Sequence, residues 1–471
     1  MASAPTCCRK GWRVSADPIA MSSFDYSEFS WDSLATNYDG TVIATIGETA
    51  AQPFAMQCAR FNGSSWVLDN PIEDYKVYDL GTIHLSDDGT LLTFNAYETG
   101  TNYKVIVQYE YAGNGNWSFV RELPNDYYDP DTGLLFGGVD LWSSMTRVSD
   151  DGSVISAGTV AVGYTSGVGY TTYVLIYRNG TPYVTKLLPT WPHELGYDWA
   201  TGISGDGNTV FIAASYAYST ARPPEEQPYG AYRVPTAQPD YYHYPNYGSI
   251  AVLEWNGSSY EKTGVMYVPE SFAQANPRIR SYVAWQGALR SNYDGTILVS
   301  ANGWSSYLIR IITNRATGYW SSIGPSYVGL IEVFKKGPSG WYFDKLIKNP
   351  ISNDEQPFYG IEDGSSSAFG FNVSLDKTGT MMLASSQYMD AMFSYVNEEL
   401  ERIMDSDYYT LDSVAPDAYT WAGAQNIAKD YDSRCVSILS RDGQKAFLLN
   451  YEMYLGDPPI QVPAVIPFER C

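Results

Sequence analysis

The sequence predicts an all-β protein, a seven-bladed β-propeller of four-stranded blades whose ring is closed by an N-terminal strand that completes the last blade. Three observations predict this fold. A turn of the type Ser-Asp-Asp-Gly-Thr returns seven times along 471 residues, a second hairpin follows most copies, and 41 Tyr, 41 Gly and 13 Trp favour strands and tight turns. We therefore expect one domain over residues 1–471.

The first hairpin of each repeat consists of a short strand, an Asp-Gly-type turn and a second strand rich in Val, Ile, Leu and Ala. Glycine suits this turn because its geometry requires a positive φ. The seven copies span Leu34–Thr45, Ile83–Phe94, Thr146–Gly158, Thr201–Ala213, Ala288–Ala301, the degenerate Phe371–Ser385, and Val436–Leu449.

The second hairpin contains an Asn-Gly or Gly-containing turn, usually with an aromatic residue just after it. Clear copies span Met56–Ile72, Val105–Leu123, Tyr173–Leu188, Ser249–Val268 and Val328–Ile347. Two hairpins make the four strands of one blade. The predicted blades cover about 33–72, 82–123, 144–188, 199–268, 285–348, 368–412 and 434–471.

The last repeat ends before a fourth strand, and the start of the chain offers the missing one. "KGWRVSADPI" at residues 10–19 resembles the fourth strands within Ser64–Ile72 and Ser339–Ile351. We therefore predict that residues 10–19 form the outer strand of blade 7, which removes a free sheet end.

Strand exchange of this kind would bring Cys471 near Cys7 or Cys8, so we expect a candidate disulfide there. Free terminal thiols in a reducing compartment are the alternative. Cys58 and Cys435 are expected to be unpaired core thiols.

The repeated pattern S-x-D-G-x-x-x-A, followed by G-x-I-x-V-aromatic, a turn and an aromatic residue, resembles the FG-GAP repeat over roughly residues 10–471. That repeat builds the propellers of integrin α-subunits and of many surface proteins. The calcium loops of that family have the form D-x-D-x-D-G. The nearest stretch, Asp129–Gly133, has Gly133 at the third acidic position, so we expect an acidic turn and no cofactor, with calcium as the less favoured alternative.

Strand order places both kinds of short turn on one face of the propeller and every long insertion on the other. The insertions are rich in Tyr, Trp, Pro and Asp, and aromatic loops on rigid scaffolds are typical of recognition surfaces. The alternative is that these loops pack on one another and cover the central channel. The predicted interaction face consists of Trp142, Trp191, Trp199, Tyr229, Tyr232, Tyr241, Tyr242, Tyr244, Trp304, Tyr319, Trp320 and Tyr359.

The net charge of −23 argues against nucleic acid and against an anionic membrane surface as partners. No apolar run is long enough to span a membrane, so membrane insertion is not expected, and no classical signal peptide is seen at the start of the sequence. We expect protein partners or glycans, an extracellular or virion-surface location, and a possible role as an assembly component.

Catalytic motifs are scarce in the sequence. It contains no G-x-S-x-G elbow and no H-E-x-x-H helix, and His84, His193 and His243 occur in unlike settings. We therefore predict a non-enzymatic structural or adhesive propeller that makes protein-protein contacts on a virion, fibre or cell surface. The alternatives are a lectin-like carbohydrate-binding propeller and a propeller hydrolase or lyase. Clustered acids around the central channel with shifted pKa values would favour an enzyme.

Overall fold

The computed structural model describes two dozen segments of the chain, almost all of them strands and the turns between them. These segments are residues 12–20, 33–47, 55–77, 82–97, 104–124, 127–130, 133–136, 146–165, 169–187, 200–214, 249–267, 279–280, 288–302, 306–307, 311–313, 320–322, 326–327, 330–347, 372–385, 390–394, 418–419, 425–426, 436–455 and 460–470. Within them no helix is long and apolar enough to cross a membrane.

Seven antiparallel sheets each contain one Asp-Gly-type turn, which joins the first two strands of the sheet. The first four sheets are β3 (Leu34–Thr36), β4 (Val42–Gly47), β5 (Ala55–Phe61), β6 (Trp66–Leu68); β8 (Ile83–Leu85), β9 (Leu91–Tyr97), β10 (Lys104–Gly113), β11 (Asn116–Pro124); β14 (Arg147–Val148), β15 (Val154–Thr165), β16 (Gly169–Arg178), β17 (Thr181–Leu187); and β18 (Ala200–Ile203), β19 (Thr209–Ala214), β20 (Ser249–Trp255), β21 (Tyr260–Tyr267).

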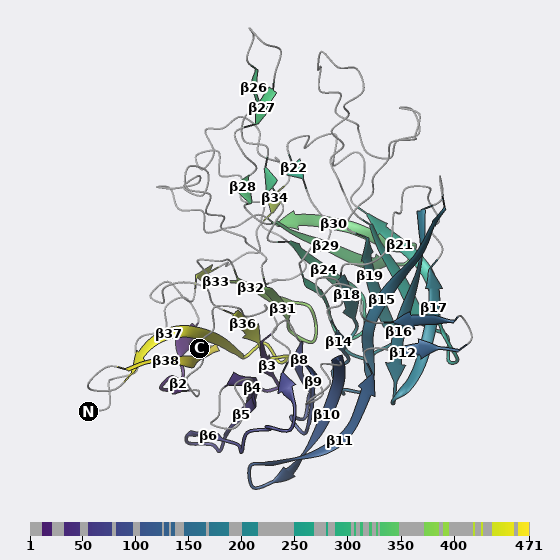
Figure 1. Cartoon of the computed structure of the whole chain (residues 1–471). Coiled ribbons are helices and arrows are strands. Elements are labelled where there is room, and N and C mark those ends of the chain that lie inside the picture. Colours follow the sequence, from purple (N-terminus) through teal and green to yellow (C-terminus); the bar gives the residue numbers. More distant parts are fainter. Residues whose placement is uncertain are drawn as a thin grey trace.

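The other three sheets follow the same plan. They are β23 (Ala288–Ser291), β24 (Ile297–Asn302), β29 (Leu330–Gly337), β30 (Gly340–Ile347); β31 (Asn372–Leu375), β32 (Met381–Ser385), β33 (Asp390–Ser394), β35 (Gln425–Asn426); and β36 (Val436–Leu439), β37 (Lys445–Leu455), β38 (Ile460–Arg470) with β1 (Trp12–Val14). In Figure 1 the first strands β3, β8, β14, β18, β31 and β36 lie toward the middle of the molecule, and β6, β11 and β17 lie outside them. This is the arrangement of a β-propeller, so the predicted all-β class and four-stranded sheets are confirmed.

Neighbouring sheets pack face to face through apolar side chains. Seven clusters of buried residues each join two consecutive sheets, and one of them joins the last sheet to the first through Phe447 and Ile43. Because both faces of a sheet are covered, its strands are apolar without alternation. Val210 to Ala213 of β19, for example, are all fully buried.

The sheet built by β36, β37 and β38 takes its edge strand from the other end of the chain. β1 pairs antiparallel with β38, with Trp12 opposite Arg470 and Val14 opposite Phe468. β2 (Ile19–Ala20) pairs with the same strand near Val465. The Ile19 side chain is buried in the cluster between the last and first sheets. The N-terminal segment therefore contributes both backbone pairing and apolar surface.

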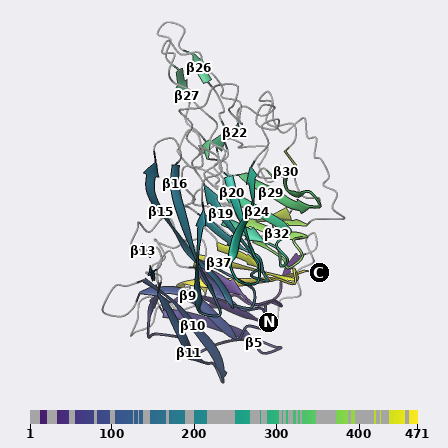
Figure 2. The ribbon, with the colours of Figure 1, turned by 90° about the vertical axis from the view of Figure 1, so that its right-hand side faces the viewer.

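Some strands depart from the repeat. β35 lies past residue 412, where the sequence placed the end of the sixth repeat. β34 (Ala418–Tyr419) adds in parallel to the outer strand β30, and β7 (Lys76–Val77) pairs with β9 beside β8. Figure 2 shows the long hairpin of β15 and β16 standing up on one side of the molecule.

Further short strands form separate small sheets. These are β12 (Tyr127–Asp129) with β13 (Leu134–Phe136), β22 (Ile279–Arg280) with β25 (Ser306–Tyr307) and β28 (Ser326–Tyr327), and β26 (Ile311–Thr313) with β27 (Trp320–Ser322).

Candidate functional site

Each of the seven Asp-Gly-type turns is built by the same local hydrogen bonds. In the second sheet the Ser86 hydroxyl donates to Asp88 at 2.6 Å and accepts from the backbone N–H of Leu91 at 2.9 Å. Ser149, Ser204 and Ser440 repeat this pattern, and the side chains of Asn37, Asn292 and Asp376 take the same place. The glycine of every turn has a φ between 61° and 75°, as the sequence predicted.

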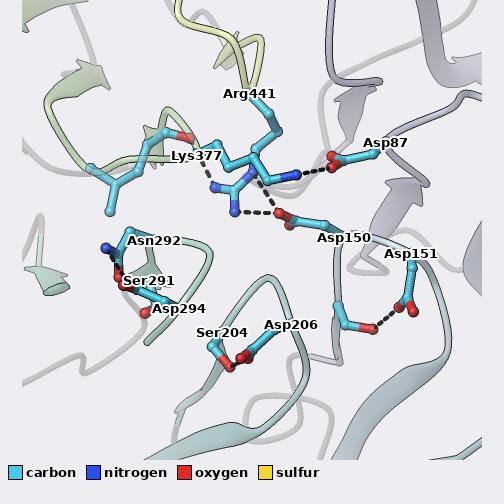
Figure 3. A network of polar contacts seen from close by, with 12 residues as sticks. Asp87, Asp150, Asp151, Ser204, Asp206, Ser291, Asn292, Asp294, Lys377 and Arg441 are labelled. Carbon is cyan, nitrogen blue, oxygen red and sulfur yellow. Dashed lines mark hydrogen bonds and ion pairs between the residues drawn. The ribbon is translucent and has the colours of Figure 1, made fainter. Parts of the chain in front are cut away.

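One residue directly follows the capping residue in each of the seven turns. We call the seven residues at this position the axial cluster. They are Tyr38, Asp87, Asp150, Gly205, Tyr293, Lys377 and Arg441. Each comes from a different sheet, and Figure 3 shows four of them meeting at one place.

Backbone hydrogen bonds link the seven turns in one direction. The N–H of Tyr38 donates to Asp87, Asp87 to Asp150, and Asp150 to Gly205, at 2.7 to 3.0 Å. The next bonds run from Gly205 to Asn292, Tyr293 to Lys377, Lys377 to Arg441, and Asp442 back to Tyr38, at 2.6 to 3.3 Å. The turns are therefore linked by backbone hydrogen bonds, which do not depend on their side chains.

Two ion pairs join axial residues that are far apart in sequence (Figure 3). The Lys377 Nζ lies 2.9 Å from Asp87 Oδ2, and the Arg441 Nη2 lies 2.7 Å from Asp150 Oδ2. Arg441 also donates through Nε to Asp150 and through Nη1 to the carbonyl of Leu375. The pairs connect the second sheet to the sixth and the third sheet to the seventh, so each joins sheets that are not consecutive in the sequence.

Two tyrosines flank this charged centre. The Lys377 Nζ lies 4.2 Å from the ring centre of Tyr293 and 5.2 Å from that of Tyr38, within cation–π range. Tyr38 and Tyr293 remain 39% and 40% exposed, and the side chains of Lys377 and Asp87 are 34% and 27% exposed. The axial cluster is thus open to solvent at this face.

Burial and charge oppose each other at the Lys377–Asp87 pair. Burial, followed by the nearby Asp150 carboxylate, raises the pKa of Asp87 against the pull of Lys377 and Arg441. Burial alone would lower the pKa of Lys377, but its hydrogen bond and attraction to Asp87 raise it. Asp87 therefore holds a proton more readily than an isolated aspartate, while Lys377 stays charged.

His84 lies on β8, near enough to Asp150 and Arg441 of the axial cluster to be affected by their charges. Burial lowers its pKa to about 4, against the attraction of Asp150 and a hydrogen bond to the Ser149 backbone. Its ring is therefore neutral near pH 7. The buried Nε2 atom has no hydrogen-bond partner among the residues that the structure places.

The residues predicted from the sequence as an interaction face fall almost entirely outside the described segments. Trp320 is the exception: it lies on β27, where the backbone alone is placed. Trp142, Trp191, Trp199, Tyr229, Tyr232, Tyr241, Tyr242, Tyr244, Trp304, Tyr319 and Tyr359 lie outside. Cys7, Cys8, Cys435 and Cys471 also lie outside, so the candidate disulfide stays a prediction.

Two further sequence predictions concern cysteine and metal. Cys58 is a buried free thiol in the core between the first two sheets, and burial raises its pKa. Asp129 is buried, and its carbonyl accepts from Gly133 N–H at 2.8 Å, in the stretch considered for calcium. Across the described segments no group of three or more His, Cys, Asp or Glu side chains is placed to hold a metal ion.

The axial cluster was missed by the sequence analysis. Its signal was present, because the position after the capping residue reads Tyr, Asp, Asp, Gly, Tyr, Lys, Arg along the seven repeats. A repeat position that carries balanced charges inside a repeated turn pattern points to contacts between repeats.

Comparison with known proteins identifies fold relatives only. No family model and no curated protein matches the sequence. The chain is similar to the periplasmic gluconolactonase PpgL of Pseudomonas aeruginosa (12% identity, TM-score 0.38, covering 80% of this chain and 91% of that one). It is also similar to an oligogalacturonate lyase in complex with manganese (10%, 0.42, 97% and 91%). The β-propeller domain of the Trilobed protease from Pyrococcus furiosus is a third (8%, 0.41, 95% and 95%).

These comparisons correct one prediction and leave others open. The prediction of a structural or adhesive binding propeller is wrong, because the similar propellers include a gluconolactonase and an oligogalacturonate lyase. That the chain is not an enzyme stays a prediction, since these proteins share only 10–12% of their sequence with it. The FG-GAP resemblance stays a prediction, since no family model matches.

Proposed function

We infer that the seven sheets are the blades of a closed seven-bladed propeller in which β1 is the outer strand of blade 7. Three observations support this. The backbone bonds between the turns return from Asp442 to Tyr38, an apolar cluster joins the last sheet to the first, and β1 extends the sheet of β38. Closure of this kind leaves no open face at either end of the array.

We propose that the protein is an acid–base enzyme of the hydrolase or lyase type, with its active site at the axial cluster. The observation that carries this proposal is the meeting of two carboxylates, Asp87 and Asp150, with the cations Lys377 and Arg441 at a solvent-open centre. Because the pKa of Asp87 is raised, we assign proton transfer to Asp87 and a different role to Asp150.

In this mechanism Asp87 is the proton donor and acceptor. Its raised pKa lets it carry a proton closer to neutral pH, so that it can protonate a leaving oxygen, or take a proton once ionised. Asp150 is held by two hydrogen bonds from Arg441, which fixes its carboxylate beside the reacting centre. Lys377 lies next to Asp87 and stabilises negative charge that develops on the substrate.

The surroundings favour a small, hydroxyl-rich substrate that carries a negative charge, such as a sugar acid or its lactone. Tyr38 and Tyr293 lie beside Lys377 and are partly exposed, so their rings are available for stacking on a substrate. Lys377 and Arg441 supply positive charge on a protein whose net charge is −23. A carboxylate on the substrate would replace the Asp87 carboxylate as the ion-pair partner of Lys377.

The test is turnover of sugar lactones, glycosides and oligogalacturonates by the full chain, followed by chromatography of the products. We expect Asp87→Asn to lower kcat/KM by about a hundredfold or more. Glu254→Gln is the matched control, because Glu254 also pairs with a lysine, Lys336, but away from the axis. Its kcat/KM should stay unchanged.

Either of two results would show the proposal to be wrong. One is a folded Asp87→Asn protein with wild-type turnover, and the other is no turnover of any sugar lactone, glycoside or oligogalacturonate. Unfolding midpoints measured in parallel separate loss of chemistry from loss of fold. As the proton donor, Asp87 must be protonated, so the activity of the wild type should fall as the pH rises above the raised pKa of Asp87, and Asp87→Asn should lack this decrease.

A further inference from the structure

Four Asn-Gly pairs lie in turns between the outer strands, and the structure divides them into two geometries. Asn114 and Asn179 both have a φ of 53° and begin two-residue hairpin turns. Asn62 and Asn256 begin four-residue turns with the same sequence, Asn-Gly-Ser-Ser, between β5 and β6 and between β20 and β21.

In the longer turns the asparagine side chain is bonded back to the main chain. The Asn62 Oδ1 accepts from Ser64 N–H at 3.0 Å, from the Ser64 hydroxyl at 2.8 Å and from Ser65 N–H at 2.9 Å. The Asn256 Oδ1 accepts from the same three groups of Ser258 and Ser259, each at 2.9 Å. Two separate blades thus build the same three-donor arrangement.

We propose that Asn62 and Asn256 are sites of spontaneous deamidation that the fold itself promotes, whereas it protects Asn114 and Asn179. The ring closed by the Ser64 N–H bond to Oδ1 contains the backbone nitrogen of Gly63, so the bond restrains the side-chain carbonyl and that nitrogen within one compact turn. Three donors on Oδ1 polarise the carbonyl and stabilise the oxyanion that forms during attack.

The reaction needs water alone as co-reactant. The Gly63 nitrogen loses its proton to hydroxide and forms a bond to the Asn62 Cγ, giving a tetrahedral oxyanion on Oδ1. The bond from Cγ to Nδ2 breaks, the nitrogen takes a proton from water, and ammonia leaves. Water then opens the succinimide to aspartate or isoaspartate, so that one water is consumed and one ammonia is released overall.

Space around the glycine supports the same division. A Cβ added at Gly63 or Gly257 would meet nothing within 4 Å, so these turns lie open to water. At Gly115 the attacking N–H is already committed, because it donates to the Tyr111 hydroxyl at 3.0 Å. Gly180 packs against the guanidinium of Arg121, 2.6 Å from where a Cβ would lie.

The two reactive sites differ in one contact. The Asn256 Nδ2 also donates to Glu261 Oε1 at 2.7 Å. Deamidation would remove this hydrogen bond and place the new carboxylate next to that of Glu261, which it would repel. The Asn62 Nδ2 donates instead to the neutral Ser65 hydroxyl, at 3.3 Å. We therefore expect Asn62 to react first.

The experiment incubates the folded full chain at mildly alkaline pH and follows each Asn-Gly peptide by mass spectrometry and isoaspartate detection. Conversion at Asn62 and Asn256 should exceed that at Asn114 and Asn179 by about tenfold. The chain unfolded in urea is the reference, and all four pairs should react there at similar rates, because the sequence at the reacting bond is the same.

Two serine variants test the donors, each with an internal control. Ser64→Ala should slow the reaction at Asn62 by about two- to tenfold and leave Asn256 unchanged, and Ser258→Ala should do the reverse. Both serines lie on exposed turns, so the fold should tolerate the changes. Equal rates at all four pairs in the folded protein, or faster reaction at Asn114 or Asn179, would overturn the proposal.

Discussion

Gly205 is the member of the axial cluster that has no side chain, and its neighbours explain why. A Cβ at this position would overlap the Asp150 carboxylate and would lie 2.8 Å from Cδ2 of the Tyr293 ring. The space that a side chain would need is thus filled by the two neighbouring members of the cluster. Glycine is required here by close approach and not by its backbone conformation.

We expect Gly205→Ala to destabilise the protein by about 1–3 kcal/mol, because Asp150 or Tyr293 must move to admit the methyl group. Denaturant unfolding measures the change. Gly264→Ala is the control, since a Cβ at Gly264 would meet nothing within 4 Å. A neutral Gly205→Ala variant would show that the axial cluster adapts freely.

His84 makes the stability of the protein depend on pH. Its pKa is about 4 in the folded protein against an ordinary value of 6.5, so the unfolded chain binds the extra proton between these values. Stability from this residue is complete above pH 6.5 and is lost as the pH falls toward 4. Burial of a neutral imidazole is the cause.

We expect the free energy of unfolding to fall by about 3 kcal/mol over this range through His84 alone. The raised pKa of Asp87 acts in the opposite direction, so the measurement compares the wild type with His84→Gln. The difference between their stabilities should shrink as the pH falls. Parallel curves would rule out a titrating His84.

At the scale of the element, one contact between blades recurs at the end of the third strand. Arg60 at the end of β5 donates to the carbonyl of Gly89 and lies 3.4 Å from the Tyr111 ring centre of the next blade. Arg178 at the end of β16 donates to the carbonyl of Gly207 and lies 4.7 Å from the Trp255 ring centre.

The contact at Arg178 can be tested with a substitution. Arg178→Ala removes bonds to Gly207 and to the Tyr260 hydroxyl together with the stacking on Trp255, and we expect a loss of about 2 kcal/mol. Arg178→Lys should recover less than half, because lysine cannot span both acceptors and stack. Lys186→Ala on the adjacent β17 is the control and should change the unfolding midpoint little.

The repeat itself was predictable from the sequence because it is local. A turn such as Ser86–Thr90 carries its own capping hydroxyl, its own carboxylate and a glycine with positive φ, all within five residues. The contacts of the axial cluster were not, because Lys377 and Asp87 are 290 residues apart and meet only when the blades assemble. The parallel strand β34 could not be predicted from the sequence, since two residues are too few to show a periodic pattern of apolar side chains.

For the whole molecule, the N-terminal segment and the last blade depend on each other. β38 is the penultimate strand of its sheet, and β1 is the edge strand that pairs with it. Without β1, the eleven-residue strand β38 would offer one edge of its backbone to other chains. β1 and β38 therefore stabilise each other within one sheet, although they lie more than 440 residues apart in the sequence.

We expect Arg13→Pro to destabilise the protein by about 3 kcal/mol and to promote aggregation, because proline removes a backbone donor opposite Glu469. Arg13→Ala keeps the donor and serves as the control. Thermal unfolding and light scattering give the two readouts. If both variants behave like the wild type, the pairing of β1 contributes nothing to stability.

The pairing of Trp12 with Arg470 has a consequence for how the chain can be cut and rejoined. These residues face each other across an antiparallel pair, so a linker of hairpin length can join residues 12 and 470 covalently. The backbone bonds between the turns run around the axis in one direction and have no first member. A circularly permuted gene whose new chain ends lie in another connection between blades should therefore encode a protein with the same fold.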